Sequence, residues 1–295
     1  MQYVKLNNGV EMLMLGYGVY QVTKEECERC VLDALKAGYR LIDTAQSYFN
    51  EEEVGSAIKK SSVPREEIFL TTKVWIEHYG YEEAKKSIIN SMKKLQVDYI
   101  DLVLMHQPFN DYYGTWRAME KLYKEGKIKA IGISNFYPDR MVDITSFAKI
   151  KPMVNQIEIH PHYQQTEAIK WNKKYGLQVE AWAPFGEGRG GLFGNEILKN
   201  IGNKYGKTLA QVILRWHLQR GVVVIPKSTH YERMVENFNV FDFKLSEEDM
   251  NLISTLDKNK SSFFSHNDPA MVEWFVKMVE KRKKQHDSSK ENKNW

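Results

Sequence analysis

The sequence is short of cysteine, of long apolar runs and of any leader-like start. Two cysteines in 295 residues cannot build a disulfide framework, and such usage fits a reducing compartment. No apolar run reaches the ~18 residues that a membrane-spanning helix needs. The opening MQYVKLNNG lacks the basic and apolar regions of a signal peptide. These absences predict a cytoplasmic protein that neither crosses nor binds a membrane.

Residues with metal-binding spacing are also few, and they lack companions. Cys27 and Cys30 lie inside a helical pattern of apolar residues, which is typical of core filling. His160 and His162 flank a proline, but no carboxylate or third histidine stands at ligand spacing from them. We therefore predict no metal site.

The positive charge is confined to one end of the chain. The formal net charge is +4, and residues 277–295 carry seven Lys and Arg against three acids, so residues 1–276 are neutral overall. The polar composition of 277–295 predicts a helix end that frays into disorder. A basic arm for nucleic acid is the alternative, but residues 1–276 offer no basic face or motif to support it. We expect one domain, 1–276, a charged disordered tail, 277–295, and no nucleic-acid partner.

Turn signals and periodicity predict a hairpin followed by eight strand–helix units. The sequence Asn7-Asn8-Gly9 separates two short apolar runs, and Asn-Gly is the strongest short hairpin signal. Strand-like runs follow at Leu15–Tyr20, Arg40–Asp43, Ile68–Val74, Ile100–His106, Ile128–Ser134, Val154–His160, Gln178–Ala183 and Val222–Pro226. Helical periodicity falls at 24–37, 50–61, 81–95, 112–125, 138–148, 166–175, 196–219 and 231–238, with a last helix from Ser246.

Local signals support these boundaries. Helix starts that match a capping box are Thr23 with Glu26 and Thr208 with Gln211. Helix stops are expected at Gly38, Gly126, Gly176 and Gly221. Eight strand-then-helix units favour the α/β class, closed into a (β/α)8 TIM barrel with an N-terminal β-hairpin. The alternative is an open doubly wound sheet, but the first strand–helix turn, GYGVYQVTKEE, lacks the third glycine of a dinucleotide fingerprint.

The segment YRLIDTAQSYFNEEEVG, residues 39–55, places ionisable groups where α/β folds carry their chemistry. A short strand closes on Asp43, a loop presents Tyr48, and Asn50 with three acids opens a helix through capping and the macrodipole. Two later strands also end on ionisable residues, Lys73 and His106. In a closed barrel these strand ends share one rim, on adjacent strands ~4.8 Å apart.

These four side chains suit the reduction of a carbonyl group. Lys73, held charged by Asp43, is expected to lower the pKa of Tyr48 from its reference of ~10 and to make the phenol a general acid. His106 would polarise the same substrate oxygen. Hydride must come from a nicotinamide, because no side chain supplies it. The structural alternative is an ion pair between Asp43 and Lys73, a loop tyrosine and a strand-end histidine without a shared role.

From about Tyr3 to about Phe275, the sequence resembles the aldo-keto reductase family. Within the family it is similar to the branch of 2,5-diketo-gluconate reductases and prostaglandin F synthases. The matching motifs are GYRLIDTAQSYFNEEEVG, TTKVW, LVLMHQP, GISNF, VNQIEIHP, AWAPFG, and IPKS followed by R-x-x-E-N. The resemblance implies a barrel that uses NADPH/NADP+, with Tyr48 as proton donor, Asp43 and Lys73 assisting it, and His106 orienting the carbonyl.

The resemblance also implies where the cofactor lies. Ser134, Asn135 and Gln156 would bind the nicotinamide carboxamide, and Trp182 would stack on the ring. The pyrophosphate would meet Gly186, Gly188 and the loop EGRGGLFGN, and Gly18 and Phe185 would also bind the cofactor. The adenosine phosphate and adenine would meet Lys227, Ser228, Thr229, Arg233, Glu236 and Asn237. Val19 stands where relatives usually have threonine, which removes a hydroxyl contact. Plain flexible loops and a solvated basic pair are the alternatives for the glycines and the cations.

Aromatic residues just past strand ends predict the substrate pocket. These are Tyr20, Trp75 and Phe109, with His106 among them, and Phe264 and His266 are candidates from the C-terminal segment. The expected function is NADPH-dependent reduction of aldehydes and ketones by a monomer. Two alternatives remain: a cofactor-binding sensor with little turnover, as in the potassium-channel β subunits of the family, and a Schiff-base lyase that uses Lys73.

Overall fold

The computed structural model describes residues 1–291, and for 283–291 it describes the backbone alone. The chain forms two compact units, Met1–Ser262 and Phe263–Trp295. In the first unit, eight parallel strands pair in chain order in a single sheet. They are β3 (Tyr17–Gly18), β4 (Leu41–Asp43), β5 (Phe69–Val74), β6 (Ile100–Met105), β7 (Ile128–Ser134), β8 (Val154–Glu158), β9 (Gln178–Trp182) and β10 (Val223–Val224).

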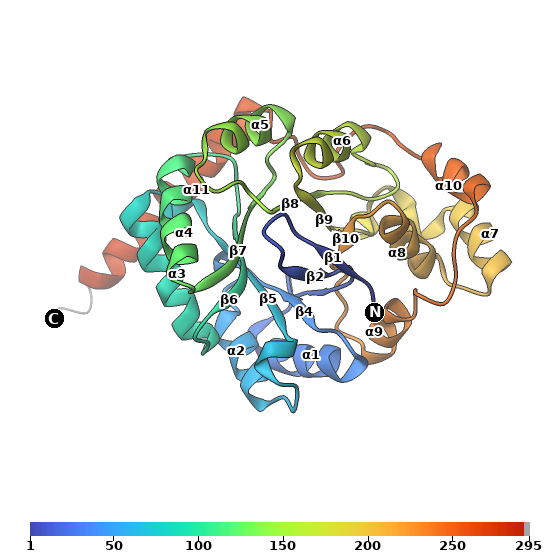
Figure 1. Ribbon diagram of the computed structural model, residues 1–295, viewed down its shortest axis with the longest axis horizontal. Helices are drawn as coiled ribbons and strands as arrows, with labels where there is room; N and C mark the ends of the chain where they lie inside the picture. Colours follow the sequence, from blue (N-terminus) through green and yellow to red (C-terminus); the bar gives the residue numbers. More distant parts are fainter. Residues whose placement is uncertain (292–295) are drawn as a thin grey trace. The chain divides into compact units, whose positions relative to one another are not determined.

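The sheet closes on itself. The backbone N–H of Gly16 donates to the carbonyl of Val224 at 2.9 Å, and the N–H of Val224 donates to the carbonyl of Met14 at 3.0 Å. These bonds join the last strand to the segment that leads into the first. Figure 1 shows the helices outside the ring of strands. The predicted (β/α)8 barrel is therefore confirmed.

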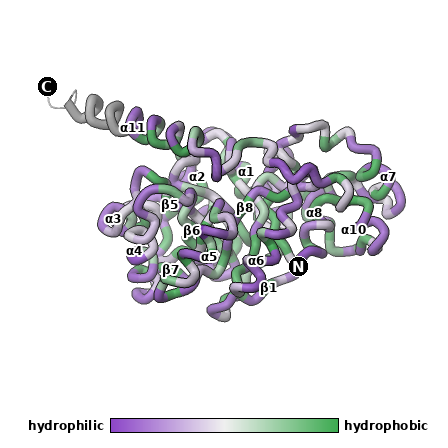
Figure 2. Tube along the Cα trace, turned by 90° about the horizontal axis from the view of Figure 1, so that it is seen from above, coloured by the Kyte–Doolittle hydropathy of each residue, from purple (hydrophilic) through white to green (hydrophobic). Residues whose placement is uncertain are grey.

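Helices cover the barrel because each buries one apolar stripe against the strands. The barrel helices are α1 (Lys24–Ala37), α2 (Glu51–Lys60), α3 (Tyr81–Leu95), α4 (Tyr112–Lys124), α5 (Pro138–Phe147), α6 (Thr166–Tyr175), α8 (Leu209–Gln219) and α9 (Tyr231–Phe238). Additional elements are α7 (Glu196–Tyr205), α10 (Glu247–Ser254) and the 3-10 turns η1 (Gln46–Tyr48), η2 (Arg65–Glu67), η3 (Ile76–His78) and η4 (Gly186–Gly194). Figure 2 shows hydrophobic strand segments in the interior and alternating hydrophobic and hydrophilic residues along the outer helices. No helix in the described part of the chain is long and apolar enough to cross a bilayer.

The hairpin covers the amino end of the barrel. Strands β1 (Tyr3–Lys5) and β2 (Glu11–Leu13) pair antiparallel, as the Asn-Gly signal predicted. In Figure 1 the pair lies across the middle of the ring. The side-chain amide of Asn7 donates to the carbonyls of Pro152 and Gly176, which precede β8 and β9, and Asn8 donates to that of Lys129 in β7. The hairpin is thus bonded to the amino ends of three strands.

Most predicted boundaries agree with the structure, and three predictions are wrong. The helix predicted over 196–219 is two helices, because Gly206 takes a left-handed φ of 62° and ends α7. Thr23 stands at the start of α1 without a side-chain capping bond. Asn50 does not cap α2 either, since its side-chain oxygen accepts from the hydroxyl of Thr44 instead. The capping box of Thr208 and Gln211 is confirmed.

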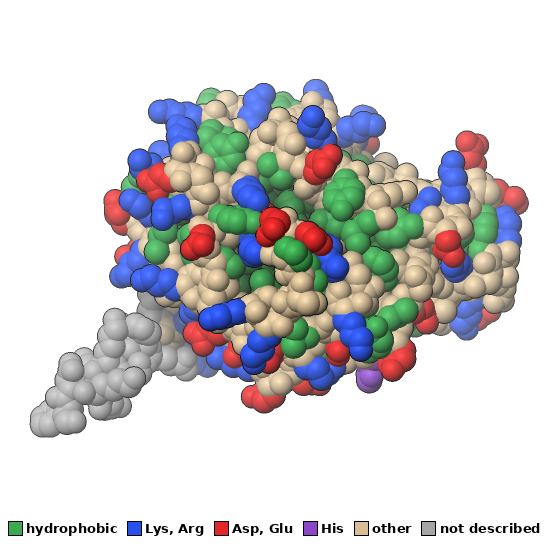
Figure 3. All heavy atoms as spheres, turned by 60° about the horizontal axis from the view of Figure 1, so that its bottom comes forward, with side chains coloured by type: hydrophobic (Ala, Val, Ile, Leu, Met, Phe, Trp, Pro, Cys, Tyr) green, Lys and Arg blue, Asp and Glu red, His purple; other side chains and the backbone are tan. Residues whose placement is uncertain are grey.

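The second unit contains α11 (Pro269–Glu291). Within it the ring of Phe264 lies 4.7 Å from that of His266 and 5.8 Å from that of Phe275. Helix α11 includes residues 277–291, and residues 292–295 lie outside the described part. The predicted boundary at residue 276 and the predicted disorder beyond it stay predictions, as does the approach of Phe264 and His266 to the substrate. On the face that Figure 3 shows, basic and acidic side chains are interspersed.

Candidate active site

Three of the four predicted catalytic side chains meet at the carboxyl end of the barrel. Lys73, fully buried on β5, donates to Asp43 Oδ1 on β4 at 2.5 Å and to the carbonyl of Thr44 at 3.1 Å. The third N–H group of the ammonium donates to the hydroxyl of Tyr48 at 3.2 Å. The turn η1 carries this tyrosine back over the strand ends. An ammonium has three N–H groups, and each has a partner here.

The fourth residue, His106, stands beside them at the end of β6. Its ring centroid is 5.7 Å from that of Tyr48 and 4.9 Å from that of Trp75. Nδ1 lies 3.4 Å from the hydroxyl of Ser47, and the backbone carbonyl accepts from the amide of Asn135 at 3.0 Å. The sequence reasoning had not included Ser47. The structure therefore brings the four predicted residues together on one rim.

The pKa of the phenol differs from what the sequence suggested. Burial raises the pKa of Tyr48 to about 12, and the opposing effect of the Lys73 ammonium is smaller. Burial disfavours the charged form of Lys73, but the Asp43 carboxylate and the phenol outweigh it and raise the pKa of this lysine. The expected lowering of the Tyr48 pKa is wrong for this structure. The free energy lost when the phenolate is removed from water is larger than the free energy gained from its attraction to the Lys73 ammonium. Tyr48 is therefore held in its acid form at neutral pH.

Beneath this rim lies a carboxyl that the sequence reasoning missed. Glu180 on β9 is completely buried inside the barrel, and its Oε2 accepts from Gln156 Nε2 at 2.8 Å. The same amide nitrogen donates to Asp43 Oδ2 at 2.9 Å. The sequence contains a signal for this residue. Gln178, Glu180 and Trp182 alternate with apolar residues, and alternate residues of a strand lie on the same face of the sheet.

The predicted carboxamide-binding residues follow one another around the rim. Ser134 on β7 is in register with Gln156 on β8. Asn135 follows directly in the left-handed region, at φ 64°, and its side-chain oxygen accepts from the indole N–H of Trp182 at 2.8 Å. Trp182, at the end of β9, is half-buried. Hydrogen bonds link these four residues to one another, and Asn135 links them to the carbonyl of His106.

The glycine-rich loop after β9 is a distorted 3-10 segment, η4. Gly186, Gly188, Gly190 and Gly191 all have positive φ, which L side chains rarely adopt. Phe185 packs on Phe193 at the far end of the loop, with ring centroids 5.8 Å apart. A side chain at Gly186 would lie about 3.5 Å from the ring of His160, so the backbone passes close to the end of β8.

The residues predicted to bind the adenosine part follow β10 and enter α9. Lys227 and Arg233 are exposed. Ser228 is buried, and its hydroxyl contacts the backbone of His230. Thr229 accepts from Arg29 through its carbonyl. Glu236 accepts from the hydroxyl of Thr208, and Asn237 is buried in α9.

Gly18 and Val19 occupy the end of β3. A side chain at Gly18 would meet the carbonyl oxygen of Ile225 at 3.1 Å, so glycine allows the first and last strands to approach. Val19 is fully buried and belongs to the core. At the rim, the ring of Tyr20 is half exposed and lies 4.9 Å from that of Tyr48. Phe109 and Trp75 are buried.

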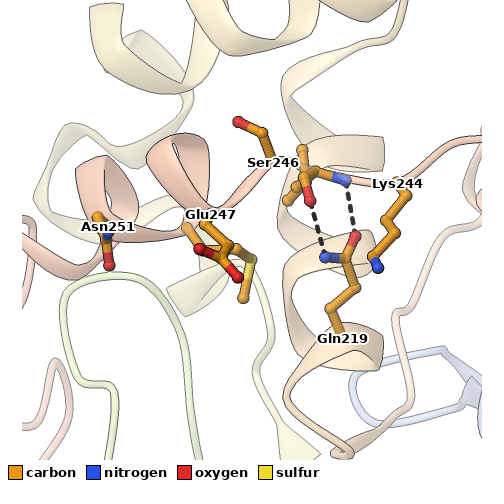
Figure 4. A pocket seen from close by; sticks show the side chains of 7 residues that line it. Gln219, Lys244, Ser246, Glu247 and Asn251 are labelled. Carbon is orange, nitrogen blue, oxygen red and sulfur yellow. Dashed lines mark hydrogen bonds between the residues drawn. The ribbon is translucent and has the colours of Figure 1, made fainter.

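Other parts of the molecule offer less chemistry. Cys27 and Cys30 are buried free thiols, and the described residues contain no group of three or more His, Cys, Asp or Glu placed to hold a metal ion. His160 pairs with Glu158 at 2.9 Å. A pocket of about 580 Å³ lies between α8 and α10, where the amide of Gln219 bonds both backbone groups of Leu245 (Figure 4). Gln219 and Ser246 use their side chains within the fold, the latter as the cap of α10, and α8 ends there at the barrel's amino side.

Comparison with known proteins agrees with this geometry. Residues 6–258 match the model of the Aldo/keto reductase family. The chain belongs to the aldo/keto reductase family. Glyoxal reductase of Bacillus subtilis (strain 168) is 51% identical over 259 residues, which span 87% of this chain and 93% of that protein. The chain is therefore an NADP(H)-dependent oxidoreductase that reduces carbonyl groups.

Solved structures give the same result for the barrel. An aldo-keto reductase from a Medee basin deep-sea metagenome library superposes with a TM-score of 0.88 at 46% identity, covering 90% of this reductase and 98% of that chain. A Bombyx mori aldo-keto reductase, solved in complex with NADP, superposes with a TM-score of 0.85 at 33% identity, covering 89% and 95%.

Proposed function

We propose that this reductase acts on small reactive aldehydes of the α-dicarbonyl class, with Tyr48 as the proton donor. The observation that carries the acid role is the Lys73 ammonium, which is bonded to Asp43 on one side and to the phenol on the other. The substrate class is supported by the relative named glyoxal reductase and by the narrow aromatic surroundings, in which Tyr20, Tyr48, Trp75 and His106 have neighbouring rings 4.9 to 5.7 Å apart.

The rim fits a phosphorylated nicotinamide dinucleotide. The amide of Asn135 is bonded to the carbonyl of His106, and the side-chain oxygen of Gln156 is an acceptor suited to the N–H groups of a carboxamide. Glycines with positive φ line the next loop, where backbone N–H groups can approach a pyrophosphate closely. Beyond β10, the exposed Lys227 and Arg233 supply charge-assisted donors for a phosphate monoester. NADPH, when bound, supplies the hydride.

The side chains divide the remaining work. His106 and the Tyr48 hydroxyl stand close enough to hydrogen-bond one carbonyl oxygen and to hold it for reduction. As charge grows on that oxygen, Tyr48 gives up its proton, and the adjacent ammonium stabilises the phenolate that remains. Asp43 keeps Lys73 charged and in place. The aromatic rings exclude water from the reacting atoms.

The same contacts weigh against Lys73 as a Schiff-base nucleophile. An amine must lose its proton before it attacks a carbonyl, but the partners of Lys73 raise its pKa. Borohydride treatment in the presence of substrate should therefore trap no adduct on Lys73.

Tyr48→Phe tests the proposal. This variant should lose about 10²–10⁴ in turnover, the usual contribution of a positioned acid, while NADPH still quenches protein fluorescence. Tyr123→Phe, near the end of α4 on the amino side of the barrel, removes a hydroxyl that accepts from the side-chain amide of Asn8, and should keep full activity. Unchanged turnover in Tyr48→Phe would remove the acid role.

A comparison of glyoxal with acetaldehyde tests the substrate class. A second carbonyl withdraws electrons from the first, and we expect a higher kcat/KM for glyoxal. Equal values would reduce the proposal to general carbonyl reduction. A cytoplasmic location and a monomeric state are proposed with it, and size-exclusion chromatography checks the latter.

A further inference from the structure

The barrel interior holds a second carboxyl, Glu180, that the proposed reaction does not use. It lies on β9, in register with Gln156 on β8 and with Val223 on β10. Gln156 Nε2 donates to Glu180 Oε2 at 2.8 Å and to Asp43 Oδ2 at 2.9 Å. A primary amide has two N–H groups, so both are committed to carboxyls. Gln156 thereby links the two acids across the interior.

The charges around Glu180 are unbalanced if both acids ionise. Among the described residues, the charged groups that act on it are Asp43 from β4 and the ammonium of Lys73 from β5, with the phenol of Tyr48 beyond them. One ammonium would then face two carboxylates in a fully buried site, which is costly. Burial first, and Asp43 second, raise the pKa of Glu180 to about 8.

The second oxygen of Glu180 points to the same protonation state. Oε1 is buried and has no hydrogen-bond partner among the described residues. An unpaired oxygen that carries half of a negative charge costs more in such a place than an unpaired hydroxyl. The bond from Gln156 reaches the other oxygen, which accepts equally well as the carbonyl of a neutral acid.

We propose that Glu180 is a positioning residue that works as a neutral carboxylic acid: it fixes the orientation of the Gln156 amide and leaves Lys73 paired with Asp43 alone. The inference rests on the proposed roles of Asp43, Lys73 and Tyr48. Loss of the Glu180 proton adds a negative charge that repels Asp43 and attracts Lys73. The phenol then holds its proton more tightly, and reduction slows at alkaline pH before Tyr48 itself titrates.

Two substitutions of similar size separate position from charge. Glu180→Gln keeps an oxygen for Gln156 but cannot ionise, and should reduce substrate within about threefold of the unmodified protein at neutral pH, without the alkaline decline near pH 8. Glu180→Leu removes the acceptor, and should lose about tenfold at every pH while remaining folded by circular dichroism. An alkaline decline that persists unchanged in Glu180→Gln would overturn the inference.

An infrared measurement on the cofactor-free protein gives a second readout. The difference between the unmodified protein and Glu180→Gln should contain the carbonyl stretch of a protonated carboxylic acid below pH about 8, and should lose it above. A missing band at neutral pH would overturn this inference alone, because the measurement involves neither NADPH nor turnover. An active Tyr48→Phe protein would instead overturn the proposed function.

Discussion

The two ends of the barrel differ in the polar groups that they contain. At the carboxyl end, one ammonium and two acids are buried within hydrogen-bond reach of one another or of Gln156, and the surrounding loops carry glycines in left-handed conformations. At the amino end, a two-stranded hairpin lies over the strands and bonds to them through neutral asparagine amides. The ammonium at the carboxyl end is fully buried, whereas the cations that pair with Asp101 at the start of β6, Arg65 and Lys129, remain partly exposed.

This difference separates stability from chemistry. Neutral amide bonds at the amino end stabilise the fold a little each and place no reactive group. Buried charges at the carboxyl end stabilise little on balance, because desolvation offsets their attraction, but each becomes costly when its partner is removed. Substitutions at the carboxyl end should therefore affect stability and activity together, and those at the amino end should affect stability alone.

The largest effect is expected for Lys73→Met. Loss of the ammonium leaves Asp43 buried without its cation, which should lower the free energy of unfolding by about 3–5 kcal/mol. Turnover should fall about 10²–10⁴-fold, because the phenolate formed on Tyr48 loses its stabilising charge. Urea denaturation and kcat measured on the same preparation check both effects.

The double variant Asp43→Leu with Lys73→Met sharpens this result. Removing both charges should restore most of the lost stability, since no unpaired ion remains, but turnover should stay low. Recovery of activity in the double variant would mean that the ammonium is not needed for proton transfer.

The next effect is a pH-dependent stability difference at Glu180. Its pKa is raised from about 4.5 in the unfolded chain to about 8 in the fold, so its stabilising contribution is complete below pH 4.5 and is lost as pH rises through about 8. Glu180→Gln has no proton to lose. Relative to that variant, the unmodified protein should lose a few kcal/mol over this window, at about 1.4 kcal/mol for each tenfold change in proton affinity. Parallel unfolding curves at all pH values would contradict the assignment.

A smaller effect is expected at the outer part of the carboxyl end. Arg233→Gln removes one charge-assisted donor proposed for the adenosine phosphate, and should weaken NADPH binding about tenfold, or about 1.4 kcal/mol. Binding of NADH, which lacks that phosphate, should not change. Equal losses for both cofactors, measured by fluorescence titration, would show that Arg233 acts on the fold instead.

The smallest effect belongs to the amino end. Asn7→Ala with Asn8→Ala removes three hydrogen bonds to the carbonyls of Pro152, Gly176 and Lys129, and two weaker ones that join Asn8 to Tyr123 and to Val10. The bonds are partly exposed, so the loss should be about 1–2 kcal/mol in unfolding free energy. The kcat should remain unchanged; a lower value would break the proposed separation between the two ends.

Much of the architecture could be predicted from local sequence. Asn-Gly set the hairpin, alternating strand and helix patterns indicated the barrel, and glycines marked helix ends at Gly38 and Gly176. The misreadings have different causes. Asn50 has the right type and place for a cap, but its side-chain oxygen accepts from the hydroxyl of Thr44 in the buried site. The break at Gly206 was marked locally by the glycine and by the helix-start signal at Thr208, and the continuous helix predicted over 196–219 overlooked both.

By itself, the sequence determined which residues end their strands, and hence that Asp43, Lys73 and His106 would share a rim with Tyr48, because parallel strands in a closed sheet all end on one side. Only the tertiary structure decided the proton affinities. Burial depends on every neighbour at once, and it raises the pKa of Tyr48 against the pull of Lys73. The tertiary structure also revealed Glu180, which is linked to Asp43 by the amide of Gln156. Along the chain, Gln156 lies 24 residues from Glu180 and 113 residues from Asp43.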